Sequence, residues 1–281
     1  MYPLYSKYKF YFTYAYYKLT TPFECKNFRL KILFNEFSFL FYTLGFGKLN
    51  SKYITKILLK TKFGNFKIRD IGIDKNIASP AFERLDLEEL MRRINITLTR
   101  NHKVLFIDVG AGFGKYTVSI GTHFRKYRNK LTILSFEPEP ESFKLLNENV
   151  RLNNLKNVRT FRRALSDKTA IQTFYFYDPM KMIVSFPTNK KVHIRTDSLD
   201  SYWKHFGKNN KTELFMVIDV EEHEVAVLKG CRKAIGMVKN ATLLIEDSAT
   251  ATSQKLLRYL SHNGVLLTKK TPYNSFWNLT S

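Results

Sequence analysis

The sequence is poor in cysteine and in long apolar runs. It has two cysteines in 281 residues, Cys25 and Cys231, and their wide separation indicates neither a disulfide framework nor a zinc module. The longest uncharged apolar run, residues 37–47, is shorter than the ~20 residues that span a bilayer as a helix. Residues 1–20 are aromatic and cationic and lack the aliphatic core of a secretory signal. We therefore expect a cytoplasmic protein without a transmembrane helix.

Acidic residues are also scarce. There are 24 Asp and Glu against 46 Lys and Arg, so the formal net charge is +22. Such a surface favours anionic partners: nucleic acid, acidic glycans or a phospholipid face. The shortage is strongest in residues 1–60, where Tyr and Phe interleave with Lys and Arg, and the acids are Glu24 and Glu36. We interpret residues 1–60 as an aromatic, basic N-terminal extension and residues 61–281 as the main domain.

The extension has three interpretations. It can pack its aromatic side chains on the main domain, lie peripherally at a membrane interface, or stack on the bases of RNA. The sequence does not decide among these three.

From residue 100 onward, apolar strands alternate with helices. Core strands are expected at residues 103–109, 131–137, 157–165, 214–220 and 241–247. Helices are expected at residues 116–128, 139–153 and 254–261, and around Val225 to Leu228. The segments "IQTFYFY" and "VHIRTDSL" predict a hairpin or meander before the fourth core strand, and short apolar segments end the chain near residues 264–270 and 274–278. This alternation predicts an α/β fold with a doubly wound, mostly parallel sheet.

A glycine loop follows the first core strand in "FIDVGAGFGKYT". Gly110, Gly112 and Gly114 let the backbone turn sharply and approach a ligand next to a helix N-terminus. Glu137, which ends the second strand, can accept hydrogen bonds from both hydroxyls of an adenosine ribose. Asp108 can meet a cationic amino-acid group. Together these residues favour S-adenosylmethionine over a nicotinamide dinucleotide or an empty glycine turn.

Several segments resemble the FkbM-type methyltransferases. They are "FIDVGAGFGKYT", "LSFEPEPESFKLLNENVRLNNL", "RALSD", "TDSLDSY" and "VIDVEEHEVAVLKG", which follow one another in the family's order over roughly residues 60–250. The last is the most specific, because the family typically has I-D-V-E-G-x-E-x-x-V-L-x-G there. The matching positions are Ile218, Asp219, Val220, Glu221, Glu224, Val227, Leu228 and Gly230. Glu222 departs from the family, which usually has glycine there because of a positive φ or a close backbone approach.

The resemblance implies a class I S-adenosylmethionine-dependent methyltransferase. Its fold would be Rossmann-like, with seven strands and an antiparallel final strand. Its acceptor would be a hydroxyl oxygen on a sugar, a polyketide or a similar metabolite, which includes an anionic glycan or a lipid-linked substrate. By the same likeness, the donor would be surrounded by Asp108, Gly110, Gly112, Glu137, Asn153, and the turn containing Ala164, Ser166 and Asp167.

The acidic stretch after the fourth core strand provides candidate catalytic groups. Ligands gather at the carboxyl ends of parallel strands, and a hydroxyl nucleophile needs a base or a metal ion to remove its proton. We predict Asp219 as the base or metal ligand, with Glu221 and Glu224, i,i+3 neighbours on a helix face, orienting the hydroxyl or sharing a divalent cation. His223 is an alternative base, and Glu246 can close the pocket from the next strand. Favourable electrostatics at a helix N-terminus is the alternative explanation of these acids, but Asp219 precedes the helix.

Two other functions remain open. The charge and the N-terminal extension motivate an RNA methyltransferase on the same fold, although the N/D-P-P-Y type loop and the paired catalytic cysteines of base-methylating enzymes are missing. Glu222 motivates the other, a catalytically inactive methyltransferase fold that docks a membrane or a partner.

Overall fold

The computed structural model describes residues 56–69, 74, 77–79, 82–177, 182–184, 188–203, 212–238, 240–246, 251–271 and 274–280. The chain divides into two compact units, Met1–Ile57 with Ile68–Arg84, and Leu58–Lys67 with Leu85–Ser281. Strands β1 (Lys56–Thr61) and β2 (Gly64–Arg69) form a two-stranded sheet. The predictions for residues 1–55 lie outside the described residues.

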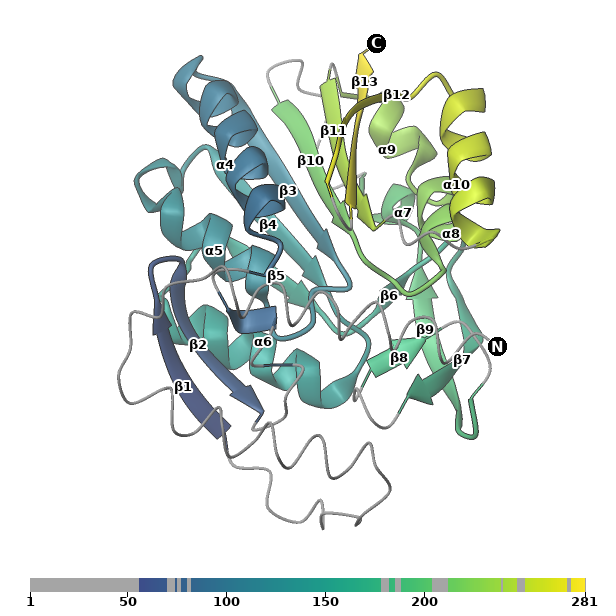
Figure 1. Cartoon of the computed structure of the whole chain (residues 1–281), viewed down its shortest axis with the longest axis horizontal. Helices are drawn as coiled ribbons and strands as arrows, with labels where there is room; N and C mark the ends of the chain where they lie inside the picture. The colour runs from purple at the N-terminus through teal and green to yellow at the C-terminus, as the bar shows by residue number, and fades with distance from the viewer. Residues whose placement is uncertain are drawn as a thin grey trace. The chain divides into compact units, whose positions relative to one another are not determined.

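The larger unit is built on a seven-stranded sheet in the order β12-β13-β11-β10-β3-β4-β5 (Figure 1). Its strands are β3 (Lys103–Val109), β4 (Leu131–Phe136), β5 (Val158–Phe161), β10 (Thr212–Ile218), β11 (Asn240–Glu246), β12 (Leu266–Lys270) and β13 (Asn274–Thr280). The neighbours from β5 to β11 pair in parallel, whereas β13 is antiparallel to both β11 and β12. The predicted doubly wound, mostly parallel sheet with an antiparallel final strand is confirmed.

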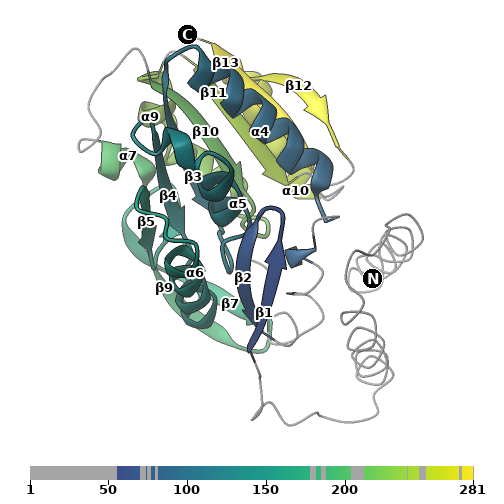
Figure 2. The same ribbon diagram turned by 90° about the vertical axis from the view of Figure 1, so that its left-hand side faces the viewer.

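Helices cover both faces of this sheet (Figure 2). One face carries α4 (Arg84–Thr99), α5 (Lys115–His123) and α6 (Pro140–Leu152), and the other carries α7 (Leu199–Trp203), α8 (Glu224–Lys229), α9 (Arg232–Gly236) and α10 (Ala251–His262). Strand side chains alternate between the two faces. Phe106 therefore packs in the core under α4 and α5, and Ile107 packs in the core under α7 to α10. Burial on both faces explains why the core strands are apolar throughout.

A smaller sheet is inserted between β5 and β10. Its four strands, in the order β6-β9-β7-β8, are β6 (Ala164–Leu165), β7 (Ala170–Tyr177), β8 (Met182–Val184) and β9 (Lys191–Asp197). β7 pairs antiparallel with both β8 and β9, which confirms the predicted hairpin or meander. The single strand predicted at residues 157–165 was wrong. The chain changes sheets within it, so β5 pairs in the main sheet and β6 in the insert.

Other element boundaries differ from the sequence prediction. The helix expected over residues 116–128 ends at His123 and is followed by the short 3₁₀ helix Arg125–Tyr127. Helix α4 was not predicted, although Leu87, Leu90, Ile94 and Leu98 follow a helical period and are buried. Among the described residues, no helix combines the length and the apolar composition needed to cross a bilayer.

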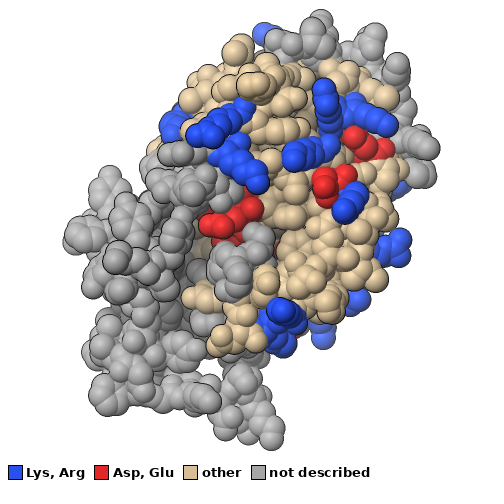
Figure 3. All heavy atoms as spheres, turned by 90° about the vertical axis from the view of Figure 1, so that its right-hand side faces the viewer, with Lys and Arg blue, Asp and Glu red and all other residues tan. Residues whose placement is uncertain are grey.

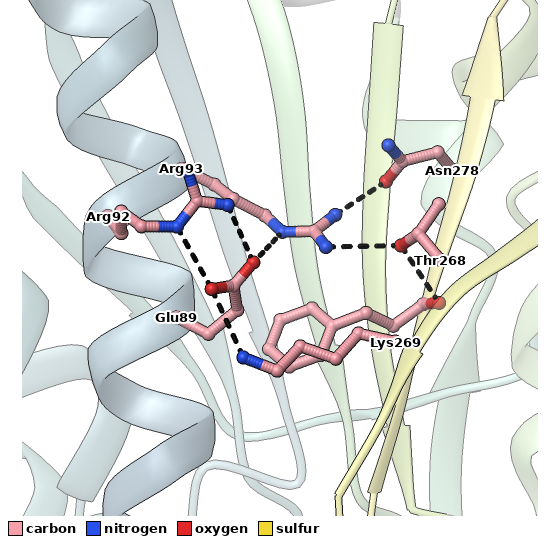
Figure 4. Close-up of polar contacts among 7 residues, drawn as sticks. Glu89, Arg92, Arg93, Thr268, Lys269 and Asn278 are labelled. Carbon is pink, nitrogen blue, oxygen red and sulfur yellow. Dashed lines mark hydrogen bonds and ion pairs between the residues drawn. The ribbon is translucent and has the colours of Figure 1, made fainter.

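A polar cluster centred on Glu89 ties α4 to the edge of the sheet (Figure 4). Arg92 donates to its carboxylate at 3.0 and 2.8 Å, and Arg93 donates at 2.7 Å. The ammonium group of Lys269 on β12 lies 3.3 Å from the same carboxylate. The hydrogen bonds from Arg92, together with Arg93 and Lys269, overcome the opposing effect of burial and hold the pKa of Glu89 at about 2.

Arg93 spans the gap between the helix and the two strands. Besides Glu89, its guanidinium donates to Asn278 on β13 at 3.0 Å and to Thr268 on β12 at 3.1 Å. It also lies over the ring of Phe276, 4.8 Å from the centroid. Arg93 is therefore the residue that links α4 to both strands.

We expect Glu89→Gln to destabilise the protein at neutral pH by about 1–3 kcal/mol, because it removes the charge of the buried carboxylate on which Arg92, Arg93 and Lys269 converge. The folded pKa of about 2 lies below 4.5, the ordinary value for glutamate, so this contribution is complete above pH 4.5 and is lost as the pH falls toward 2. Urea denaturation at pH 7 and at pH 3 measures both effects. An equal loss at the two pH values would contradict the assignment.

Arg92 and Arg93 provide a matched pair of variants. The side chain of Arg92 is 58% exposed and that of Arg93 is 15% exposed. Arg93→Ala is therefore expected to cost more stability than Arg92→Ala, which should lie near the ~0–1 kcal/mol typical of surface ion pairs.

Candidate active site

Four acidic side chains predicted from the sequence lie at the carboxyl ends of neighbouring strands of the sheet. Asp108 is the second-last residue of β3, and Glu137 directly follows β4. Asp219 directly follows β10, and Glu246 ends β11. These four strands are parallel neighbours, so their carboxyl ends lie side by side.

The three glycines of the loop after β3 serve different purposes. All have positive φ, +83° for Gly110, +54° for Gly112 and +96° for Gly114. A Cβ at Gly110 would lie 1.8 Å from the carbonyl oxygen of Asp219, and one at Gly114 would lie 2.7 Å from a methyl group of Leu146. A Cβ at Gly112 would meet nothing within 4 Å. Internal packing therefore requires Gly110 and Gly114, whereas Gly112 borders open space.

Glu137 lies against this open glycine. One carboxylate oxygen accepts a hydrogen bond from the backbone N–H of Gly112 at 2.8 Å, and the other accepts one from the N–H of Glu139 at 2.8 Å. An acid that can bind ribose hydroxyls thus lies beside backbone that a ligand can approach, and this arrangement fits the adenosine part of S-adenosylmethionine.

Asp108 holds the first turn of α5. It is 2% exposed, and its Oδ2 accepts hydrogen bonds from the backbone N–H and the hydroxyl of Thr117 at 3.0 and 2.6 Å. These bonds fix the helix that follows the glycine loop. A contact between Asp108 and the amino-acid group of the donor stays a prediction.

Asn153 and Asn149 connect α6 to β2. The amide of Asn153 accepts from the N–H of Asn65 at 2.9 Å and donates to the carbonyl of the same residue at 2.7 Å. Asn149, one helical turn earlier, makes the same pair of bonds with Lys67 at 2.6 and 2.9 Å. Each side-chain amide thus makes two hydrogen bonds to the backbone of one β2 residue, as the backbone of a neighbouring strand would. Asn153, expected near the donor, lies in this contact, and the sequence analysis missed Asn149.

Three carboxyl groups form a cluster at the ends of β10 and β11. Asp219, Glu221 and Glu246 each have an oxygen within 4.8 Å of the other two. Burial, helped by the charges of Glu224 and Glu222, raises the pKa of Glu221 to about 7. Burial and the neighbouring acids raise the pKa of Glu246 well above its usual range, and a hydrogen bond connects it to Asp219. The protonated form of Glu246 is therefore favoured more than that of an ordinary glutamate.

The backbone that carries this cluster is strained. Glu221 has φ of +52° and Glu222 has φ of +73°, a left-handed conformation that favours glycine. Helix α8 begins only at Glu224, so the prediction that Glu221 and Glu224 share a helical face was wrong. Glu224 is 4% exposed, and its carboxylate accepts from the N–H of Glu222 at 3.2 Å. Glu224 thus closes the turn that presents Glu221.

His223 lies on the side of the insert, where Ser166 fixes its ring. Ser166 Oγ lies 2.9 Å from His223 Nε2 and donates its proton to Asp167 at 3.1 Å. It accepts from the amide of Gln172 at 3.0 Å. Since the hydroxyl has one proton, hydrogen-bond accounting assigns a proton to His223 Nε2. Burial lowers the pKa of His223 and so favours the neutral ring, in which this tautomer leaves a lone pair on Nδ1.

The turn around Ser166 also packs against the end of α8. A Cβ at Gly230 would lie 1.9 Å from the carbonyl oxygen of Ser166, so this position requires glycine. Ala164 lies opposite Thr196 in the insert, and the ring of Phe174 meets that of His223 edge-on at 5.0 Å. Of the predicted donor residues, Ala164 thus lies in strand β6 of the insert, and Ser166 and Asp167 lie in the turn that follows it, where Ser166 contacts His223.

We expect Glu222→Gly to stabilise the protein by about 1 kcal/mol, because glycine adopts the left-handed conformation without the steric cost of a Cβ. Glu222→Ala is the matched control, since it removes the same charge and keeps the Cβ. Urea denaturation compares the two. Equal stability of the alanine and glycine variants would contradict the backbone explanation.

Comparison with solved structures finds methyltransferases of low identity. A SAM-dependent methyltransferase from Agrobacterium tumefaciens is 9% identical, with a TM-score of 0.47, over 82% of this chain and 72% of the other. A SAM-dependent methyltransferase from Aquifex aeolicus is 15% identical, with a TM-score of 0.42, over 73% and 96%. TYW2 of M. jannaschii in complex with AdoMet is 14% identical, with a TM-score of 0.39, over 82% and 88%. These values carry no argument about substrate.

The family comparison is more informative. The search of curated proteins finds no match. The methyltransferase FkbM domain matches residues 108–267, more than half of the chain and the part that holds both the glycine loop and the acidic cluster. The chain therefore belongs to the FkbM methyltransferase family, and S-adenosylmethionine is its cofactor.

Proposed function

We propose that the protein transfers the methyl group of S-adenosylmethionine to a hydroxyl oxygen of a sugar, a glycan, a glycolipid or a similar metabolite. The observation that carries this proposal is the carboxyl cluster of Asp219, Glu221 and Glu246 beside the glycine loop. A neutral hydroxyl is a weak nucleophile, and a base close to it raises its reactivity. Burial and crowding make a carboxylate more basic than usual, and a carboxylate with a pKa of about 7, as for Glu221, suits this task.

The donor would lie along the glycine loop. Gly112 leaves room for the nucleoside, and Glu137 would accept hydrogen bonds from its ribose. S-adenosylmethionine supplies an electrophilic methyl group on a sulfonium ion. The contact between Gly110 and the backbone of Asp219 keeps the donor loop and the acidic cluster next to each other.

Within the cluster, the pKa of Glu221 indicates which residue acts as the base. Glu221 has a pKa of about 7, so a large fraction is ionised at neutral pH while it stays basic enough to accept the hydroxyl proton. Asp219 directly follows β10 and lies within 4.8 Å of the carboxyl oxygens of Glu221 and Glu246, which suits it to orienting the hydroxyl. We therefore assign the base to Glu221 and positioning to Asp219. His223 Nδ1 is the alternative acceptor.

The same three carboxylates fit a divalent cation. Hard cations prefer oxygen ligands, and a cation would relieve the repulsion among Asp219, Glu221 and Glu246. Glu224 is less suited to this role, because its carboxylate accepts backbone hydrogen bonds of the turn. A bound cation would acidify the acceptor hydroxyl.

Because different residues bind the donor and carry out methyl transfer, substitutions should affect these two properties separately. Glu137→Gln should weaken S-adenosylmethionine binding by about tenfold, because it removes the charge that accepts the ribose hydroxyls. Glu221→Gln should leave donor binding within about twofold and lower methyl transfer by at least ~100-fold, the range typical of general-base removal. Asp219→Asn should likewise spare donor binding and lower methyl transfer, because the acceptor hydroxyl loses its orienting group. Calorimetry measures binding. Turnover is measured as transfer of a labelled methyl group to a host-cell extract that is then divided into glycan-plus-lipid, RNA and protein fractions.

The labelled fraction tests the acceptor class. Label in the glycan-plus-lipid fraction that disappears with Glu221→Gln supports O-methylation of a sugar hydroxyl. Label in RNA would contradict the proposed acceptor and favour an RNA methyltransferase. Donor binding without transfer to any fraction would favour a catalytically inactive docking protein.

A further inference from the structure

The insert sheet has one face toward the active site and one toward solvent. Gln172 and Phe174 on β7 point to the inner side, where they contact Ser166 and His223. Because strand side chains alternate, the residues between them lie on the opposite face. We call this opposite face the outer face. It is formed by Ile171, Thr173, Tyr175 and Tyr177 of β7 and by Lys191, His193 and Arg195 of β9.

The outer face places aromatic and cationic side chains in adjacent rows. Lys191, His193 and Arg195 are all exposed and follow one another every ~6.7 Å along β9. In the antiparallel register, Tyr175 pairs with Lys191, Thr173 with His193, and Ile171 with Arg195. Tyr175 and Tyr177 are partly exposed, and Ile171 is 75% exposed.

The positive charge of the outer face is largely unbalanced. The acid that continues the β9 row, Asp197, is buried, accepts a hydrogen bond from Tyr202 at 2.7 Å and lies 3.5 Å from Arg163. It therefore does not neutralise Lys191 or Arg195 at the surface. Figure 3 shows more Lys and Arg than Asp and Glu on the side of the molecule where β7 and β9 lie in Figure 1.

The chemistry of its exposed side chains indicates which class of anionic partner the outer face binds. An acidic glycan would use the cations of the outer face, but the aromatic rings in the neighbouring row are the feature that stacking on nucleic-acid bases requires. A membrane surface is bound through protruding apolar side chains, and Ile171 alone among these seven residues provides one. A single nucleic-acid strand needs cations for its phosphates and aromatic rings for its bases, and both are present in neighbouring rows.

We propose that the outer face binds single-stranded nucleic acid. Lys191 and Arg195 would contact phosphates, while Tyr175 and Tyr177 would stack on bases. This inference goes beyond methyl transfer to the hydroxyl acceptor, because the outer face lies on the side of the insert opposite Ser166 and His223.

Fluorescence anisotropy of the full chain with a labelled 12-nucleotide oligo-U RNA tests the proposal. The double variant Lys191→Ala/Arg195→Ala should reduce the slope of log K against log salt by about 1.4, since each phosphate contact contributes about 0.7 for a single strand. Tyr175→Leu removes the ring but keeps an apolar side chain. It should weaken binding by about 5- to 100-fold with little change in that slope.

The charge-matched control is Lys255→Ala/Arg258→Ala, which removes two exposed cations from α10. Equal effects of the two double variants would overturn the proposal in favour of a diffuse cationic surface. Absence of RNA binding at low salt would overturn it too. So would binding to vesicles of phosphatidylcholine and phosphatidylserine that the RNA does not displace. Thermal denaturation checks that each variant is folded.

Discussion

The close contact between the backbones after β3 and β10 determines the site. The carbonyl oxygen of Asp219 occupies the place where a side chain at Gly110 would begin, so these two chain segments touch without any side chain between them. This contact places the open turn at Gly112 beside the acidic stretch. A bulkier residue at 110 would push apart the donor loop and the carboxyl cluster, which are the two halves of the proposed reaction.

The second constraint is electrostatic. In a chain of net charge +22, three carboxyl groups are held close together, and burial and mutual repulsion raise the pKa of Glu221 and of Glu246. The turn that holds them pays in backbone strain at residues 221 and 222, and Glu224 stabilises it by accepting backbone hydrogen bonds. Strain and repulsion concentrated in one turn are typical of a functional site.

The sequence predicted the parts of this arrangement that depend on local pattern. Apolar strands, the glycine loop and the strand-end acids Glu137 and Asp219 were all recognisable, because period and position relative to a strand are local properties. It did not predict that Glu221 leaves the helix, since charge pattern alone does not reveal φ. Nor did it predict the break between β5 and β6, the amide bonds of Asn149 and Asn153, or the proton network of Ser166, because each depends on a partner distant in sequence.

The most direct test of the central claim is the titration of Glu221 itself. Carbon-13 NMR of protein carrying labelled glutamate carboxyls follows each group, and Glu221→Gln identifies the resonance. The account predicts a resonance that titrates with a pKa of about 7 and is lost in that variant. Titration of Glu221 near 4.5, the ordinary value for a solvated glutamate, would contradict a buried, proton-retaining cluster and with it the assignment of Glu221 as the base.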